Sequence, residues 1–122
     1  MQGKPAASFK DLTVWQKSHA LALVVYKTTG RFPRTEQYGL AAQMRSAAVS
    51  VPANIAEGFR RATHADKARF LNIAQGSLEE LRYYFVLATD LGYAPAETAA
   101  ADLDEVARLL DSYRRKIVAS GT

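Results

Sequence analysis

The chain has 122 residues, of which 48% are hydrophobic and 23% charged, a composition typical of a soluble globular protein with one core. It contains no cysteine, which excludes a disulfide framework and metal ligation by thiolates. The N-terminal segment MQGKPAASFKDL lacks an apolar core of signal-peptide length, and the longest apolar run, ALALVVY, is too short to span a bilayer. We therefore expect a cytoplasmic protein without a membrane segment.

The net charge of +4 is unevenly distributed along the chain. Residues 1–69 carry eleven Lys and Arg against four Asp and Glu, whereas residues 70–122 carry five against eight. An excess of positive charge in the first half permits binding to a polyanion, and it equally permits head-to-tail pairing between copies of the chain.

Apolar residues recur with helical periodicity in four segments, and no window shows the alternation of period two that a strand requires. Asp11 and Thr63 are suited to cap the first and third helices, and Gly92 is suited to end the third. We expect one domain, residues 1–122, with a flexible stretch at 1–8 and helices at about 12–29, 36–61, 64–91 and 96–119. This pattern predicts an all-α, antiparallel up-and-down four-helix bundle.

The core-facing stripe of the second helix is predicted to contain Leu40, Met44, Ala47, Val51, Ile55 and Phe59. The stripe of the third helix is predicted to contain Phe70, Ile73, Ser77, Leu81, Tyr84, Ala88 and Leu91.

The stretch SVPANIAEGFRR, residues 50–61, combines this helical periodicity with residues that disfavour a helix interior. Pro52 is expected to bend the helix, because it lacks an N–H group and its ring clashes with the preceding turn. We predict a close polar contact between the second and third helices, with Asn54 and Glu57 bonding across it; its residues are Ser50, Asn54, Glu57, Gly58, Gly76 and Ser77. A ligand or nucleic-acid site and a subunit contact are the two alternatives for this edge.

The end of the second helix and the start of the third are basic, with Arg60, Arg61, Lys67 and Arg69 expected at one end of the bundle. Cations at a helix C-terminus also complement its dipole, which is the purely structural alternative for Arg60 and Arg61. Three further cations, Lys27, Arg31 and Arg34, are expected at the opposite end. Three aromatic residues, Phe32, Tyr83 and Tyr93, would stack on nucleobases if they are exposed and otherwise belong to the core or an interface.

No arrangement of residues in the sequence indicates catalysis. Helical-bundle di-metal sites use Glu and Glu-x-x-His, but Glu57, Glu79 and Glu80 are followed at the third position by Arg or Tyr. His19 and His64 have no second ligand at helical spacing, and no nucleophile elbow or phosphate-binding glycine loop is present. We predict no catalytic residues, no metal and no cofactor.

Four segments, DLTVWQK, FPRTEQYGL, QMRSAAVSVPANIAEG and GSLEEL, follow one another along the chain. In this order and spacing the chain resembles a bacterial four-helix-bundle family, the proteins encoded in intervening sequences of 23S ribosomal RNA genes. The resemblance extends from about Phe9 to Ile117 and implies a left-handed bundle that assembles as a homopentameric ring. A relative of that family, the accessory variability determinant of diversity-generating retroelements, is a basic pentamer that partners a reverse transcriptase and binds nucleic acid.

Together these observations predict a non-catalytic, homo-oligomeric accessory protein that binds nucleic acid, structured RNA in preference to DNA, through its basic helix ends. The alternative is a protein-binding scaffold or adaptor whose uneven charge serves contacts between proteins.

Overall fold

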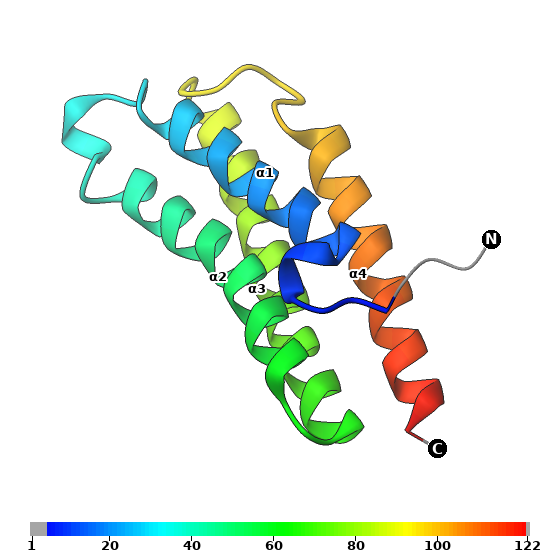
Figure 1. Ribbon diagram of the computed structural model, residues 1–122. Helices are drawn as coiled ribbons and strands as arrows, with labels where there is room; N and C mark the ends of the chain where they lie inside the picture. Colours follow the sequence, from blue (N-terminus) through cyan, green and yellow to red (C-terminus); the bar gives the residue numbers. More distant parts are fainter. Residues whose placement is uncertain (1–4, 122) are drawn as a thin grey trace.

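The computed structural model describes residues 5–121, and within that range it is all-α, with four α-helices and no strand (Figure 1). Two short 3-10 helices, η1 and η2, precede α1 and α2. The elements in chain order are η1 (Phe9–Asp11), α1 (Thr13–Thr29), η2 (Arg34–Glu36), α2 (Leu40–Arg60), α3 (His64–Asp90) and α4 (Ala100–Ser120).

Successive helices run in opposite directions, so the predicted up-and-down bundle is confirmed (Figure 1). The α2 and α3 helices pair most extensively, α1 packs against α2, α4 packs against α3, and α1 and α4 pack against each other. The end of α2, the start of α3 and the end of α4 therefore lie at one end of the bundle. The α1–α2 and α3–α4 connections lie at the other end. That the bundle is left-handed, as the family resemblance implies, stays a prediction.

Capping explains where the helices begin and end. The Thr63 hydroxyl accepts from the Asp66 N–H at 3.1 Å and so caps α3, as predicted. Gly92 has the expected left-handed conformation, with a φ of 79°. The prediction for Asp11 was wrong, because its carboxylate accepts from the N–H groups of Ala7 and Ser8 and thereby closes the capping box of η1.

Two helices begin later than the sequence pattern predicts. Residues 34–36 form η2 instead of the first turn of α2, and the Glu36 carboxylate accepts from the Leu40 N–H at 3.3 Å. The α4 helix begins at Ala100, after Glu97 and Ala99 adopt positive φ values of 65° and 62°. The predicted flexible stretch at 1–8 falls partly on residues 1–4, outside the described residues; Ser8 is ordered as the cap of η1.

The core lies along the axis where the four helices meet. The predicted α2 stripe is buried apart from Phe59, which is partly exposed. The core face of α3 differs from the predicted stripe. Two residues of that stripe, Ile73 and Leu91, are 41% and 49% exposed, which shows that the buried face is rotated about the helix axis. The α3 residues that are buried are Leu71, Ala74, Leu78, Leu81, Phe85 and Ala88. This rotation leaves apolar side chains of α3 on the surface.

Candidate nucleic-acid interface

The antiparallel arrangement collects positive charge at one end of the bundle. We define the basic end as residues 57–69 and 111–121, which contain seven Lys and Arg against three Asp and Glu. The two segments meet where the end of α4 reaches α3: His64, Ala65 and Ala68 line a shallow groove with Val118 and Gly121. The basic end thus combines four cations from the first half of the sequence with three from the second half.

At the corner between α2 and α3, two arginines share one acid and one aromatic ring. Arg69 pairs with Asp66 at 2.9 Å, and Arg61 approaches the same carboxylate at 3.8 Å. Both guanidinium groups lie 4.5 Å from the centre of the Phe70 ring, a cation–π distance. Arg61 also pairs with Glu57 at 2.9 Å. The corner is therefore a preorganised cluster in which two cations are partly neutralised.

Lys67 has a structural role in this corner. Its ammonium donates to the Phe59 carbonyl at 2.7 Å and, more weakly, to the Gly58 carbonyl at 3.4 Å, which also accepts from the Arg61 N–H at 3.2 Å. Lys67 thus helps to satisfy the carbonyls of the last turn of α2. The ammonium also lies 5.6 Å from the Phe59 ring. Because its ammonium donates to these carbonyls, Lys67 has fewer N–H groups left to bind a ligand.

Arg60 differs from the other three predicted residues. It is exposed, and it makes no ion pair with any residue in the described range 5–121. The fold also brings three cations of α4 to this end of the bundle that the sequence pattern alone did not place there: Arg114, Arg115 and Lys116. An antiparallel bundle must bring the end of α4 to the end of α2, so topology was the signal that could have found them. Arg115 pairs with Asp111 at 2.9 Å, whereas Lys116 is exposed and forms no ion pair within residues 5–121.

At the predicted polar edge of α2, one hydrogen bond between side chains joins α2 to α3. The hydroxyls of Ser50 and Ser77 lie 2.8 Å apart and join α2 to α3. The Asn54 amide donates to the Ser50 carbonyl at 2.8 Å and to the Ser50 hydroxyl at 3.0 Å, so its bonds lie within α2. Glu57 likewise bonds within α2, to Arg61, and neither side chain bridges to α3 as the sequence pattern suggested.

The two glycines near this edge have different surroundings. A Cβ on Gly58 would lie 3.2 Å from the Phe70 Cβ and 3.3 Å from the Lys67 carbonyl oxygen, so glycine lets α2 and α3 approach closely there. A Cβ on Gly76 would meet no atom within 4 Å. Close approach is therefore a property of Gly58, and the proposed role of Gly76 has no counterpart in the packing.

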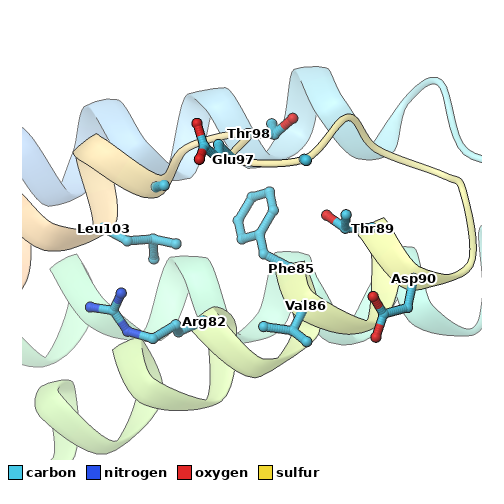
Figure 2. Close-up of a pocket in the computed structure, with 10 residues that line it drawn as sticks. Arg82, Phe85, Val86, Thr89, Asp90, Glu97, Thr98 and Leu103 are labelled. Carbon is cyan, nitrogen blue, oxygen red and sulfur yellow. The ribbon is translucent and has the colours of Figure 1, made fainter.

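A groove of about 380 Å³ lies between α3, α4 and their connection (Figure 2). The α3–α4 connection is at the end of the bundle opposite the basic end (Figure 1). Phe85 and Leu103 form the apolar floor of the groove, and Val86 is 55% exposed at its edge. Asp90 and Glu97 flank the groove without an ion pair to any described residue. Arg82 is paired with Asp104 at 3.0 Å. The groove is thus apolar at its centre and acidic at its rim.

The three aromatic residues considered for stacking have separate environments. Phe32 is buried, and Tyr93 packs on it with ring centres 5.5 Å apart. Tyr93 also donates to the Glu36 carboxylate at 3.1 Å; this bond, assisted by burial and by the charge of Glu36, raises the pKa of the Tyr93 phenol. Tyr83 is 57% exposed on α3.

The remaining chemistry of the described residues is limited. No group of three or more His, Cys, Asp or Glu side chains within residues 5–121 has an arrangement that could hold a metal ion. His19 is exposed and stacks on Trp15, with ring centres 4.9 Å apart. In the same range, no helix has the length and hydropathy that crossing a membrane would require.

The fold places the protein among small, all-α helical bundles. Residues 10–112 match the family described as 23S rRNA-intervening sequence protein, and the chain belongs to that family. A search of curated proteins finds no match to the chain.

Proposed function

We propose that this protein is a non-catalytic accessory protein that binds nucleic acid, structured RNA in particular, through its basic end. The observation that carries the proposal is the convergence of seven Lys and Arg from α2, α3 and α4, against three acids. Phosphate contacts by Lys and Arg release counterions and supply most of the affinity of sequence-independent binding. The RNA preference follows from the family resemblance.

The cations of the basic end would divide the task. Arg60 and Lys116 are exposed and unpaired within the described range, so they would contact phosphates directly. Arg61 and Arg69 are held by Asp66 and Phe70, which would fix their guanidinium groups in place for phosphate oxygens.

We further propose that the protein acts as a homo-oligomer, and the resemblance leads us to expect a pentamer. Repetition of the basic end around a ring would place several such clusters within reach of one folded RNA. Avidity would then compensate for the few unpaired cations that each copy offers.

The test is a fluorescence-anisotropy titration of labelled total cellular RNA at low and moderate salt. We expect binding at low salt, with log affinity falling linearly as log salt rises. The variant Arg60→Gln/Lys116→Gln should weaken binding and lower the salt slope by about two. The matched control, Arg108→Gln/Lys17→Gln, also removes two positive charges but lies outside the basic end, and it should retain affinity within about two-fold. Absence of binding at low salt would refute the proposal.

The acidic groove between α3 and α4 favours a second candidate, a protein-binding scaffold (Figure 2). In this alternative the groove takes the basic end of a second copy, because Asp90 and Glu97 complement its cations and the exposed Val118 matches the apolar floor. Head-to-tail contacts of this kind can close into a ring.

Salt separates the two candidates. Pairing between charged ends should dissociate as salt rises, whereas an oligomer that leaves the basic end free for RNA should persist. Sedimentation at 50 mM and 500 mM salt, together with the RNA titration, distinguishes the two. The variant Asp90→Lys should dissociate the oligomer only if the scaffold alternative is correct.

A further inference from the structure

A third groove, toward the end of the bundle opposite the basic end, combines exposed tyrosines with an arginine that has no ion pair within residues 5–121. It has a volume of about 550 Å³ and lies between the end of α1, the η2–α2 connection and the first turns of α2. Its lining residues are Tyr26, Gln37, Tyr38, Ala42, Arg45, Ser46, Val49 and Ser50. We call it the turn groove. A groove of this size is in the range of small-ligand sites.

Arg45 is fixed at the base of the turn groove by neutral groups only. Its Nε donates to the buried Thr29 hydroxyl at 2.9 Å, and its Nη2 donates to the Gln37 side-chain oxygen at 3.3 Å. The guanidinium lies 5.3 Å from the centre of the Tyr26 ring. No carboxylate in residues 5–121 pairs with Arg45. A half-buried cation held in one orientation without a counterion is suited to receive an anionic group.

The tyrosines give the groove its second property. Tyr38 is 99% exposed, and Tyr26 is 49% exposed. Aromatic faces on a polar, positively charged surface are the platforms on which unpaired nucleobases stack.

The surroundings of the groove carry further positive charge. Three exposed residues, Lys27, Arg31 and Arg34, form no ion pair within the described part of the chain; we call them the turn cations. The acid nearest in sequence, Glu36, is occupied by the Tyr93 hydroxyl and the Leu40 N–H. The positive charge beside the groove is thus available to a ligand.

We infer that the turn groove binds unpaired nucleotides of single-stranded RNA, with a base stacked on Tyr38 and the adjacent phosphate bound by Arg45. The inference rests on the proposed function and deepens it, because it assigns single-stranded segments to the turn groove and leaves the backbone of folded RNA to the basic end. Lys27 and Arg34 would contact flanking phosphates.

The test compares a labelled 12-nucleotide single-stranded RNA with a blunt duplex of the same length, titrated by anisotropy against the intact protein. Tyr38→Ala should weaken single-strand binding about ten-fold, which is within the range that loss of one base-stacking side chain produces, while duplex affinity changes less than about two-fold. Tyr38→Phe should restore binding, and Arg45→Gln should lower the salt slope by about one. The control Ile73→Ala removes an exposed apolar side chain of α3 outside the turn groove and should leave single-strand affinity unchanged.

The outcomes are distinguishable. If the unaltered protein binds neither RNA, the proposed function and this inference both fail. If it binds RNA and depends on Arg60 and Lys116 but not on Tyr38, only the inference is overturned. A change in sedimentation of Tyr38→Ala in the absence of RNA would also overturn it, because the turn groove would then be a contact between copies of the chain.

Discussion

The α2–α3 corner and the α1–α2 connection are both basic, but they hold their positive charge in different ways. At the corner, Asp66 lies between Arg61 and Arg69 and partly neutralises them. At the connection, Glu36 accepts from the uncharged Tyr93 hydroxyl and forms no ion pair, and the turn cations have no carboxylate partner within residues 5–121. Charge at the corner stabilises the fold, whereas charge at the connection faces solvent. The number of cations in a stretch of sequence therefore does not give the number that are free to bind an anionic ligand.

The largest expected effect comes from breaking the corner itself. Gly58→Val should lower the free energy of unfolding by about 2 kcal/mol, because the side chain would collide with Phe70 and the Lys67 carbonyl. The matched variant Gly76→Val enters open space on α3 and should change stability by less than about 0.5 kcal/mol. Urea unfolding followed by circular dichroism measures both. Equal losses would show that the corner is not closely packed.

The second prediction concerns the lysine that caps α2. Lys67→Met should cost about 1 kcal/mol of stability, because the Phe59 carbonyl at the end of α2 loses its lysine donor, while the Gly58 carbonyl keeps the Arg61 N–H. Lys27→Met removes the same charge at the α1–α2 connection and should cost less than about 0.5 kcal/mol. If both variants lose stability equally in urea titrations, the two basic regions do not differ as described.

A smaller effect follows from releasing the shared arginines. Asp66→Asn frees Arg61 and Arg69, so RNA affinity should rise about three-fold, while stability falls by about 0.5 kcal/mol through lost surface ion pairs and helix-dipole contacts. Glu80→Gln removes one negative charge from an exposed site on α3 and should raise affinity less. Equal gains in anisotropy titrations would mean that only net charge matters.

The smallest effect is a pH dependence at the α1–α2 connection. The hydrogen bond to Glu36 raises the pKa of Tyr93 in the folded state above its value of about 10 in the unfolded chain. Its contribution to stability is therefore fully present below about pH 10 and is lost as the pH rises through the folded-state pKa. Urea midpoints at pH 8, 10 and 11 should fall more for the unaltered protein than for Tyr93→Phe. Burial also raises the pKa of Tyr113, and that contribution remains in both proteins.

The sequence was sufficient to predict four helices and the cap at Thr63, because periodicity and capping chemistry are local. It was not sufficient to predict which face of α3 is buried, since that helix carries two overlapping apolar stripes. Packing against the neighbouring helices decides that Leu71 and Phe85 are buried while Ile73 is exposed. Starts of helices also depended on contacts distant in sequence, such as the Tyr93–Glu36 bond beside η2.

The residues of the candidate site and their position in the fold could be predicted from the sequence. Whether each charged side chain is free to bind a ligand could not. Arg60, Arg61, Lys67 and Arg69 do lie together, yet their partners are set by side-chain geometry that no spacing rule contains. The turn groove left no signal in the sequence that separated Tyr38 from the buried aromatic Phe32 six residues earlier.

The bond between the Ser50 and Ser77 hydroxyls fixes the register of α2 against α3. A slip of one turn, about 5.4 Å, would leave both hydroxyls without each other as partners and would move Gly58 away from Phe70. Small apolar residues alone would tolerate neighbouring registers almost equally well. One hydroxyl pair therefore helps to determine which residues of two long helices arrive together at the end of the bundle, and with them which cations meet.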